Sequence, residues 1–264
     1  MNKFVIVFDL DETLGNFTEL YFFWNLLKKY LDNNNLSLNY LNIIFDKFPL
    51  FFRPKLFTLL KNLKYKKIHK YCDHIMIYTN NKYDKIWSNN IKNYINYKLN
   101  YKLFDKIIYA FKIKGITIEN NRTSYEKSYY DFLNCTSLPS NTQVCFIDDK
   151  EYNYMKHPNV LYINLEPYYY YENILYIAHY FYYQNENLFN NDYIKFIKYI
   201  REKTKNNKNY IINQNYTNDK NYILINTYIT EQLIKDINSF LSTKHKNFTK
   251  NFKYLKNNKT KKLK

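Results

Sequence analysis

Uninterrupted apolar runs alternate along the first 165 residues with segments in which apolar residues recur every three or four positions. The uninterrupted runs are typical of strands buried on both faces, as in a parallel sheet, and the spaced pattern is typical of helices. The predicted strands are residues 4–8, 73–78, 104–111, 144–147 and 160–163. Strands that alternate with helices in this way predict an α/β fold, doubly wound around a mainly parallel sheet.

The segment directly after the first strand carries a helical pattern. Apolar residues recur at helical spacing over 17–31, a polar cluster at 32–35 ends that helix, and a second apolar segment covers 38–52. Residues 16–52 are therefore predicted to form a small helical insertion. Two roles fit it equally well: packing on the core, or a cap that shapes access to a neighbouring site.

Three more helices are expected within this part of the chain. Arg53-Pro54 opens the first, over 55–63, with the proline in its first turn. The second covers the spaced apolar residues of 87–95, and the third covers 122–133. Gly115 is expected in a turn between the second and third helices.

The chain changes character after Pro167. A tyrosine-rich, amphipathic helical segment covers 171–203, an Asn/Lys-rich linker covers 204–221, and a further helix covers 223–243. The predicted organisation is a domain over 1–168 that includes the insertion 16–52, a helical extension over 169–243, and a basic, disordered tail over 244–264.

The composition narrows the class of partner. The chain has 32 Tyr and 20 Phe but only 2 Gly, a bias that suits an A/T-rich genome and weakens arguments from any single Tyr, Asn or Lys. Its formal net charge is +17, and nine lysines without an acid lie from Lys244 onward, which leaves +8 (+17 less 9) on residues 1–243. A basic chain favours anionic partners, such as a phosphorylated protein, a nucleic acid or an anionic surface; a solvated tail is the alternative.

The cysteines and the apolar runs bear on location. Cys72, Cys135 and Cys145 lack Cys-x-x-Cys spacing, so we expect them to be reduced and buried in an intracellular protein, cytoplasmic or nuclear. Asp9 interrupts the N-terminal apolar run, and no uncharged stretch reaches the length of a membrane span. We therefore expect neither a signal peptide nor a membrane partner.

Polar side chains follow three of the predicted strands at the point where each strand ends. They are Asp9 and Asp11 after the first strand, Thr79 and Asn80 after the second, and Asp148 and Asp149 after the fourth. The carboxyl ends of parallel strands meet at one edge of a sheet, where open α/β proteins bind ligands. For the second and fourth strands, capping of the following helix is the alternative reading.

Asp9 and Asp11 are the most informative pair. They lie two residues apart, so in an extended chain their side chains project to the same side. Two acids held this close repel each other unless a cation or a shared proton lies between them. The pair therefore predicts a divalent metal site, a nucleophile with its acid/base partner, or both.

In this order the motifs resemble those of the haloacid dehalogenase (HAD) phosphatases, and within them the NLI-interacting-factor-like family, which includes the phosphatases of the RNA polymerase II C-terminal domain. The matching residues are Asp-Leu-Asp-Glu-Thr-Leu at 9–14, Arg53-Pro54, Thr79, Lys127 and Asp148-Asp149. Lys127 lies in the helix predicted before the fourth strand, and Lys112 and Lys114 are its rivals. The resemblance covers residues 3–165.

The resemblance implies an HAD-like phosphatase domain that hydrolyses phosphomonoesters through an aspartyl-phosphate. Asp9 would be the nucleophile and Asp11 the general acid and base. Thr79, the backbone near Asn80, and Lys127 would bind the phosphoryl group.

The resemblance also implies a cofactor. Mg²⁺ would be held by the Asp9 carboxylate, the Asp11 carbonyl oxygen and Asp148, and Asp149 would bind it directly or through a water molecule. The helical insertion over 16–52 departs from the polymerase-tail phosphatases, which carry a small β-insertion there. This difference leaves the catalytic motifs intact and lies in the segment that would shape access for the substrate.

Three functions therefore compete. The first is a phosphatase for phosphoserine or phosphothreonine in a protein, such as a polymerase tail. The second is a nucleic-acid end phosphatase, which would bind its substrate through the basic tail and aromatic side chains. The third is a non-catalytic interaction protein on an HAD fold, and the retention of Asp9, Asp11 and Asp148 argues against it.

Overall fold

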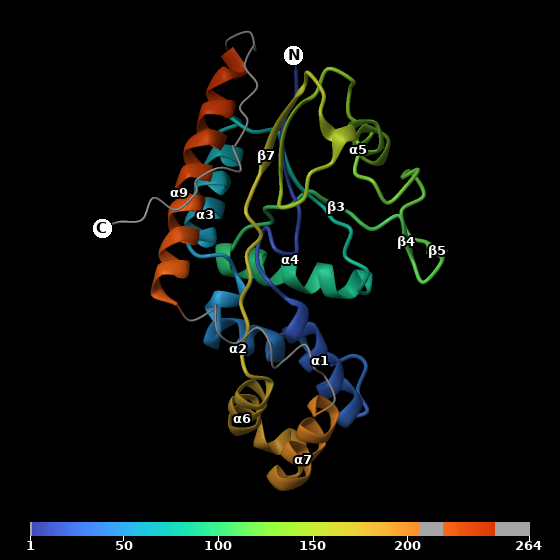
Figure 1. Ribbon diagram of the computed structural model, residues 1–264, viewed down its shortest axis with the longest axis vertical. Coiled ribbons are helices and arrows are strands. Elements are labelled where there is room, and N and C mark those ends of the chain that lie inside the picture. Colours follow the sequence, from blue (N-terminus) through green and yellow to red (C-terminus); the bar gives the residue numbers. More distant parts are fainter. Residues whose placement is uncertain (1, 206–218, 246–264) are drawn as a thin grey trace, which may run out of the picture.

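A five-stranded parallel sheet forms the centre of the protein, as seen in a computed structural model that describes residues 2–205 and 219–245 (Figure 1). The strand order is β3-β2-β1-β6-β7, and every neighbouring pair is parallel. The strands are β1 Phe4–Phe8, β2 His74–Tyr78, β3 Lys106–Ile108, β6 Gln143–Asp148 and β7 Val160–Asn164. The α/β class and the parallel sheet predicted from the apolar runs are confirmed.

The strand order places a switch point at the centre of the sheet. From β1 the chain moves outward through β2 to β3, then crosses back to β6 on the other side of β1. Connections therefore leave β1 and β6 in opposite directions. In open α/β sheets the crevice beyond the carboxyl ends of two such strands is where ligands bind.

Helices cover both faces of the sheet, as in a doubly wound fold. On one face Phe4, Ile6 and Phe8 pack in a single apolar cluster with α3 (Leu56–Ile68), α4 (Lys85–Leu99) and α9 (Lys220–Ser242). On the other face Val5 and Val7 pack with α5 (Tyr129–Thr136) and the short helix η2 (Asn153–Met155). This double covering explains why every residue of β1 is buried.

The predicted helical insertion is helical, and it packs against part of the C-terminal extension. It contains α1 (Thr18–Tyr30), α2 (Leu38–Lys47) and η1 (Pro49–Phe51), and the extension supplies α6 (Ile174–Gln184), η3 (Glu186–Phe189) and α7 (Tyr193–Thr204). The ring centroids of Phe23 and Phe181 lie 6.1 Å apart, and those of Tyr30 and Phe196 lie 5.0 Å apart. These helices form one group below the sheet in Figure 1.

The last helix, α9, returns to the sheet. It runs beside α3 (Figure 1), and Phe240 packs on Phe4 with ring centroids 5.3 Å apart. Lys244 donates hydrogen bonds to the Lys70 carbonyl oxygen at 3.0 Å and to the Asp73 carboxylate at 3.1 Å. Lys244, which the sequence analysis placed in the basic tail, is therefore packed against the domain. Residues 206–218 of the predicted linker and 246–264 of the predicted tail lie outside the described residues.

The helix expected over 122–133 begins later. Its first residue is Tyr129, and the Ser128 hydroxyl caps it by accepting the Asp131 N–H at 3.0 Å. Asp131 also accepts the N–H of Thr123 at 3.0 Å, which holds the preceding segment as a loop. The prediction that Lys127 is helical is therefore wrong, because Lys127 belongs to this loop.

Two smaller expectations also need correction. The helix after Arg53-Pro54 begins at Leu56. Lys55, which directly precedes it, has a left-handed conformation (φ 62°), so Pro54 lies before the first turn. The run 104–111 contributes only β3 to the sheet. After it comes a separate antiparallel hairpin of β4 (Lys112–Ile113) and β5 (Ile116–Thr117), which turns at Gly115 as predicted, with φ 82°.

None of the described helices is both long enough and apolar enough to cross a membrane.

Candidate active site

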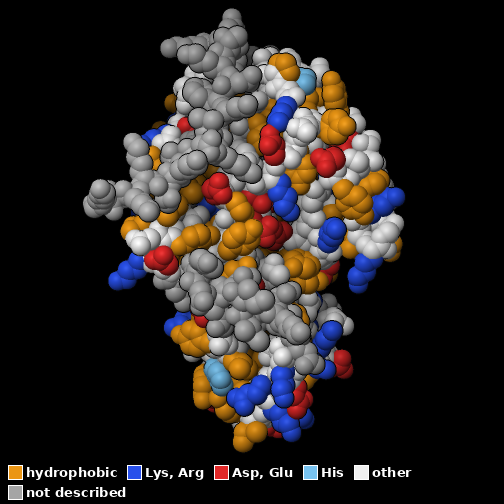
Figure 2. Space-filling model, in the orientation of Figure 1, with side chains coloured by type: hydrophobic (Ala, Val, Ile, Leu, Met, Phe, Trp, Pro, Cys, Tyr) orange, Lys and Arg blue, Asp and Glu red, His pale blue; other side chains and the backbone are white. Residues whose placement is uncertain are grey.

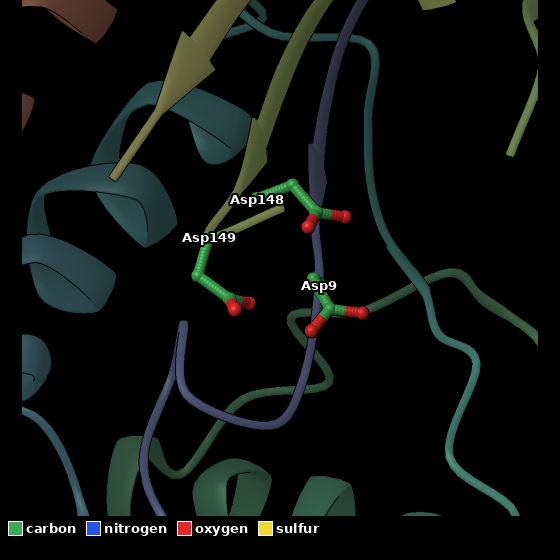
Figure 3. Close-up of side chains that lie close together, drawn as sticks. All are labelled: Asp9, Asp148 and Asp149. Atoms are coloured by element: carbon green, nitrogen blue, oxygen red, sulfur yellow. The ribbon is translucent and has the colours of Figure 1, made fainter. Parts of the chain in front are cut away.

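Three carboxylates converge at the switch point of the sheet (Figure 3). Asp9 directly follows β1, Asp148 is the last residue of β6, and Asp149 comes next. One carboxylate oxygen from each lies within 4.8 Å of the other two. Asp9 and Asp148 are buried, with 7% and 1% of their surface exposed. These oxygens could hold a metal ion.

Lys127 lies against this triad. Its ammonium group contacts the Asp9 carboxylate and donates to Asp148 Oδ2 at 2.6 Å, and the residue is only 1% exposed. Burial by itself lowers the pKa of Lys127, but Asp148 and Asp9 outweigh this and raise it above its ordinary value. Lys127 is therefore a fixed cation. The rival lysines Lys112 and Lys114 lie in the β4–β5 hairpin and its turn.

Asp11 is held by a residue that the sequence analysis did not single out. The Asn81 side-chain amide donates to Asp11 Oδ2 at 2.6 Å, whereas Asp11 Oδ1 has no hydrogen-bond partner among the described residues. Burial, reinforced by the charge of Asp9, raises the pKa of Asp11 to about 8. Asp11 is thus protonated at neutral pH, the state in which a carboxyl group can act as an acid.

Thr79 and Asn80 follow β2 at the same edge. Thr79 is 1% exposed, and its hydroxyl oxygen accepts the backbone N–H of Asn81 at 2.9 Å. The hydroxyl hydrogen of Thr79 therefore stays available for another acceptor. The side chain of Asn80 is engaged elsewhere, because it donates to the Tyr125 carbonyl oxygen at 2.8 Å and to the Tyr152 hydroxyl at 3.0 Å.

Thr13 connects the loops that follow β1 and β6. Its hydroxyl donates to Asp149 Oδ1 at 3.2 Å and accepts the Asp149 N–H at 3.1 Å. The backbone N–H of Lys150 donates to Asp148 Oδ1 at 2.8 Å. These contacts orient both acids of the β6 end toward Asp9.

The charge balance of the site favours a cation. Its acidic groups are Asp9, Asp11, Glu12, Asp148 and Asp149, and with Asp11 neutral the other four still outnumber the nearby ammonium groups of Lys127 and Lys150. Burial, together with repulsion from neighbouring acids, raises the pKa of Glu12 to about 7 and of Asp148 to about 7, although Lys127 partly offsets the shift at Asp148. Figure 2 shows the molecule from the same side as Figure 1, and acidic side chains lie near the middle of that surface with basic side chains beside them. An all-oxygen donor set with excess negative charge suits a hard divalent cation such as Mg²⁺.

The structure brings together most of the predicted site residues and adds others. Asp9, Lys127 and Asp148 are in direct contact, while the Asp11 side chain lies outside the group of three whose oxygens converge. Asn81 and Thr13 are additions, and their only sequence signal is their position inside the motifs at 79–81 and 9–14. Arg122, which donates to the carbonyl oxygens of residues 79, 109 and 125, carries no such signal.

The arrangement offers a buried carboxylate at Asp9, a protonated acid two residues away, a fixed cation and oxygen atoms that could hold a metal ion, a combination that suits phosphoryl transfer. Compared with known proteins, the chain matches no family model, no curated protein and no solved structure. The chemistry of the site is therefore inferred from its residues alone.

Proposed function

We propose that the protein is a magnesium-dependent phosphomonoesterase that works through an aspartyl-phosphate on Asp9. The observation that carries this proposal is the placement of Asp9, Lys127 and Asp148 in contact at the switch point of the sheet. The order of the motifs along the chain, which resembles that of HAD phosphatases, supports the same proposal.

In the first half of the reaction an Asp9 carboxylate oxygen attacks phosphorus, and the bond from phosphorus to the ester oxygen breaks. Asp11, protonated as its raised pKa requires, gives its proton to the leaving oxygen. Lys127 and the Thr79 hydroxyl stabilise negative charge on the phosphoryl oxygens.

In the second half a water molecule attacks phosphorus, and Asp11, now ionised, takes the proton of that water. Asp9 is released as a carboxylate together with inorganic phosphate. Asp9, Asp148 and Asp149 would hold Mg²⁺, and the bound ion would neutralise charge between the Asp9 carboxylate and the phosphate.

The preferred substrate class is a protein that carries phosphoserine or phosphothreonine, as the resemblance implies. A nucleic-acid end is a second candidate, favoured by side chains beside Asn80. Tyr125 is 48% exposed, and its ring packs edge-on against that of Phe111, with ring centroids 5.8 Å apart. Lys82 Nζ lies 5.8 Å from the centroid of the Tyr125 ring. Exposed aromatic and basic side chains of this kind can stack on bases and contact phosphates.

The test is hydrolysis of para-nitrophenyl phosphate by wild type and Asp9→Asn, with Mg²⁺ and with a chelator. We expect turnover that needs both the metal and Asp9, with a loss of at least about 10³-fold in the variant, because Asn cannot form the intermediate. Asp46→Asn on α2, whose side chain is 44% exposed, is the matched control and should keep full activity.

Equal turnover in Asp9→Asn and wild type would end the proposal. No turnover under any metal would favour the non-catalytic function instead. If the enzyme is active, comparing phosphopeptides with end-phosphorylated oligonucleotides separates the two substrate classes.

A further inference from the structure

Arg53 is buried at the centre of a network around the loop that carries Asp11. It is 2% exposed, and its Nε donates to the Thr13 carbonyl oxygen at 2.8 Å. One terminal nitrogen donates to the carbonyl oxygens of Glu12 at 2.7 Å and Glu166 at 2.8 Å. Burial lowers the pKa of Arg53 to about 10, so the guanidinium stays charged at neutral pH.

The loop that Arg53 holds contains a backbone outlier. Glu12, between Asp11 and Thr13, has a φ of 57°, in the left-handed region that residues other than glycine seldom adopt. Such a conformation persists only where surrounding contacts enforce it, and these positions concentrate at functional sites. The Glu12 carbonyl oxygen accepts two hydrogen bonds, from Arg53 and from the Tyr168 N–H at 2.8 Å.

The remaining terminal nitrogen of Arg53 reaches a helix far away in the sequence. It donates to Asn226 Oδ1 on α9 at 2.8 Å, and Asn226 is 3% exposed. The Asn226 amide nitrogen is fixed by the Tyr222 carbonyl oxygen at 3.0 Å, so the acceptor oxygen faces Arg53 in one orientation. Among the described residues, Arg53 donates to four acceptors, and the only side-chain acceptor of these is Asn226.

We propose that Asn226 is a positioning residue for catalysis: through Arg53, helix α9 holds the strained loop at Glu12 so that Asp11 faces the substrate. This inference rests on the proposed function. The same network continues from Arg53 through Thr13 to Asp149, so Asn226 also supports one of the three acids that could hold a metal ion. The C-terminal helix is therefore a working part of the active site, although it lies outside the motifs that resemble HAD phosphatases.

The test compares three variants of the full chain. Asn226→Leu removes the acceptor and keeps the branched shape of the side chain, and Asn226→Asp keeps an acceptor oxygen. Ile237→Ala removes packing from α9 at a position that makes no hydrogen bond with Arg53. Ile237 is fully buried, so its variant controls for loosening of the helix. Unfolding by urea identifies conditions under which all the variants remain folded.

Asn226→Leu should lower kcat about tenfold or more and leave KM within about twofold, because a misplaced acid slows chemistry more than binding. Asn226→Asp should keep most of the wild-type kcat, and Ile237→Ala should keep the wild-type kcat. Amide hydrogen exchange gives a readout that needs no activity. The N–H groups of Glu12 and Leu14, which bond to the carbonyl oxygens of Gly15 and Leu10, should exchange faster in Asn226→Leu alone.

Equal losses in Asn226→Leu and Ile237→Ala, or unchanged exchange in the loop of Asn226→Leu, would overturn the positioning role. If wild type shows no turnover that depends on Asp9, the proposed function fails by itself, and the exchange measurement then decides whether Asn226 holds the loop.

Discussion

At the scale of single residues, the contact between Asn81 and Asp11 balances opposing effects on one carboxyl group. Burial and Asp9 raise the pKa of Asp11, and the hydrogen bond from the Asn81 amide, which favours the charged form, lowers it. The result is a pKa of about 8. A group that must both give and take a proton works best when its pKa is near the working pH.

Asn81→Ala should therefore move the pH profile of kcat/KM. Activity in the proposed mechanism requires protonated Asp11, so it falls as the pH rises through the pKa of Asp11. Removal of the amide donor raises that pKa, and the alkaline limb should shift upward by up to about one pH unit. Asn39→Ala on the exposed side of α2 is the control. A profile that does not move would mean that another group titrates.

The buried carboxyl group of Glu19 leads to a second prediction at this scale, which concerns the stability of the protein. It is 7% exposed, and its Oε2 has no hydrogen-bond partner in the described part of the chain. Burial raises its pKa from 4.5 to about 7. The folded state then binds the proton more tightly than the unfolded state, so wild type loses stability as the pH rises from about 4.5 through 7.

Glu19→Gln removes this loss. The free energy of unfolding of the variant should equal that of wild type at pH 4.5. At pH 8 it should be larger than that of wild type by about 2–3 kcal/mol. Urea unfolding at both pH values measures the difference, and Glu202→Gln, exposed on α7, is the matched control. A gain of the same size at both pH values would point to packing instead of charge.

At the scale of elements, the insertion and the extension share one core. A single buried cluster runs from Phe4 and Phe8 in β1, through Phe23 in α1 and Phe181 in α6, to Phe196 in α7. The helices below the sheet are thus continuous with the main domain. Of the two roles open for the insertion, core packing is directly visible in these contacts.

Phe181→Ala should destabilise the whole protein. Phe181 is fully buried and its ring lies 6.1 Å from that of Phe23 and 6.0 Å from that of Tyr40. A loss of about 3–5 kcal/mol is expected, in one cooperative transition. Tyr183→Ala on the same helix, 59% exposed, should change the stability by less than about 0.5 kcal/mol. Two separate transitions would show that the helical group unfolds independently.

Some of these elements could be predicted from the sequence, and others could not. Strands β1 and β6 were predictable because each is a continuous apolar run that ends in acids. The loop that contains Lys127 was not, because its shape depends on hydrogen bonds that the backbone N–H and hydroxyl of Thr123 donate to the Asp131 carboxylate. The hydrogen bond between Arg53 and Asn226 joins residues that lie 173 positions apart, and no local sequence pattern predicts it.

At the scale of the whole molecule, an acidic site lies in a chain with a net charge of +17. The positive field should attract large anionic substrates, and salt screens such a field within about 8–10 Å. Between 50 and 300 mM salt, kcat/KM should fall steeply for a phosphorylated oligonucleotide or acidic phosphopeptide and little for para-nitrophenyl phosphate. Equal salt dependence for both would show that the net charge does not guide binding.

The packing of α9 on α3 and β1 has a consequence for how the chain is made. Because Phe240 covers Phe4, the surface at the start of the sheet stays open to solvent until residue 240 has left the ribosome. The nascent chain therefore carries an incomplete apolar core until α9 has been made, and a chaperone would find a binding surface there during that period.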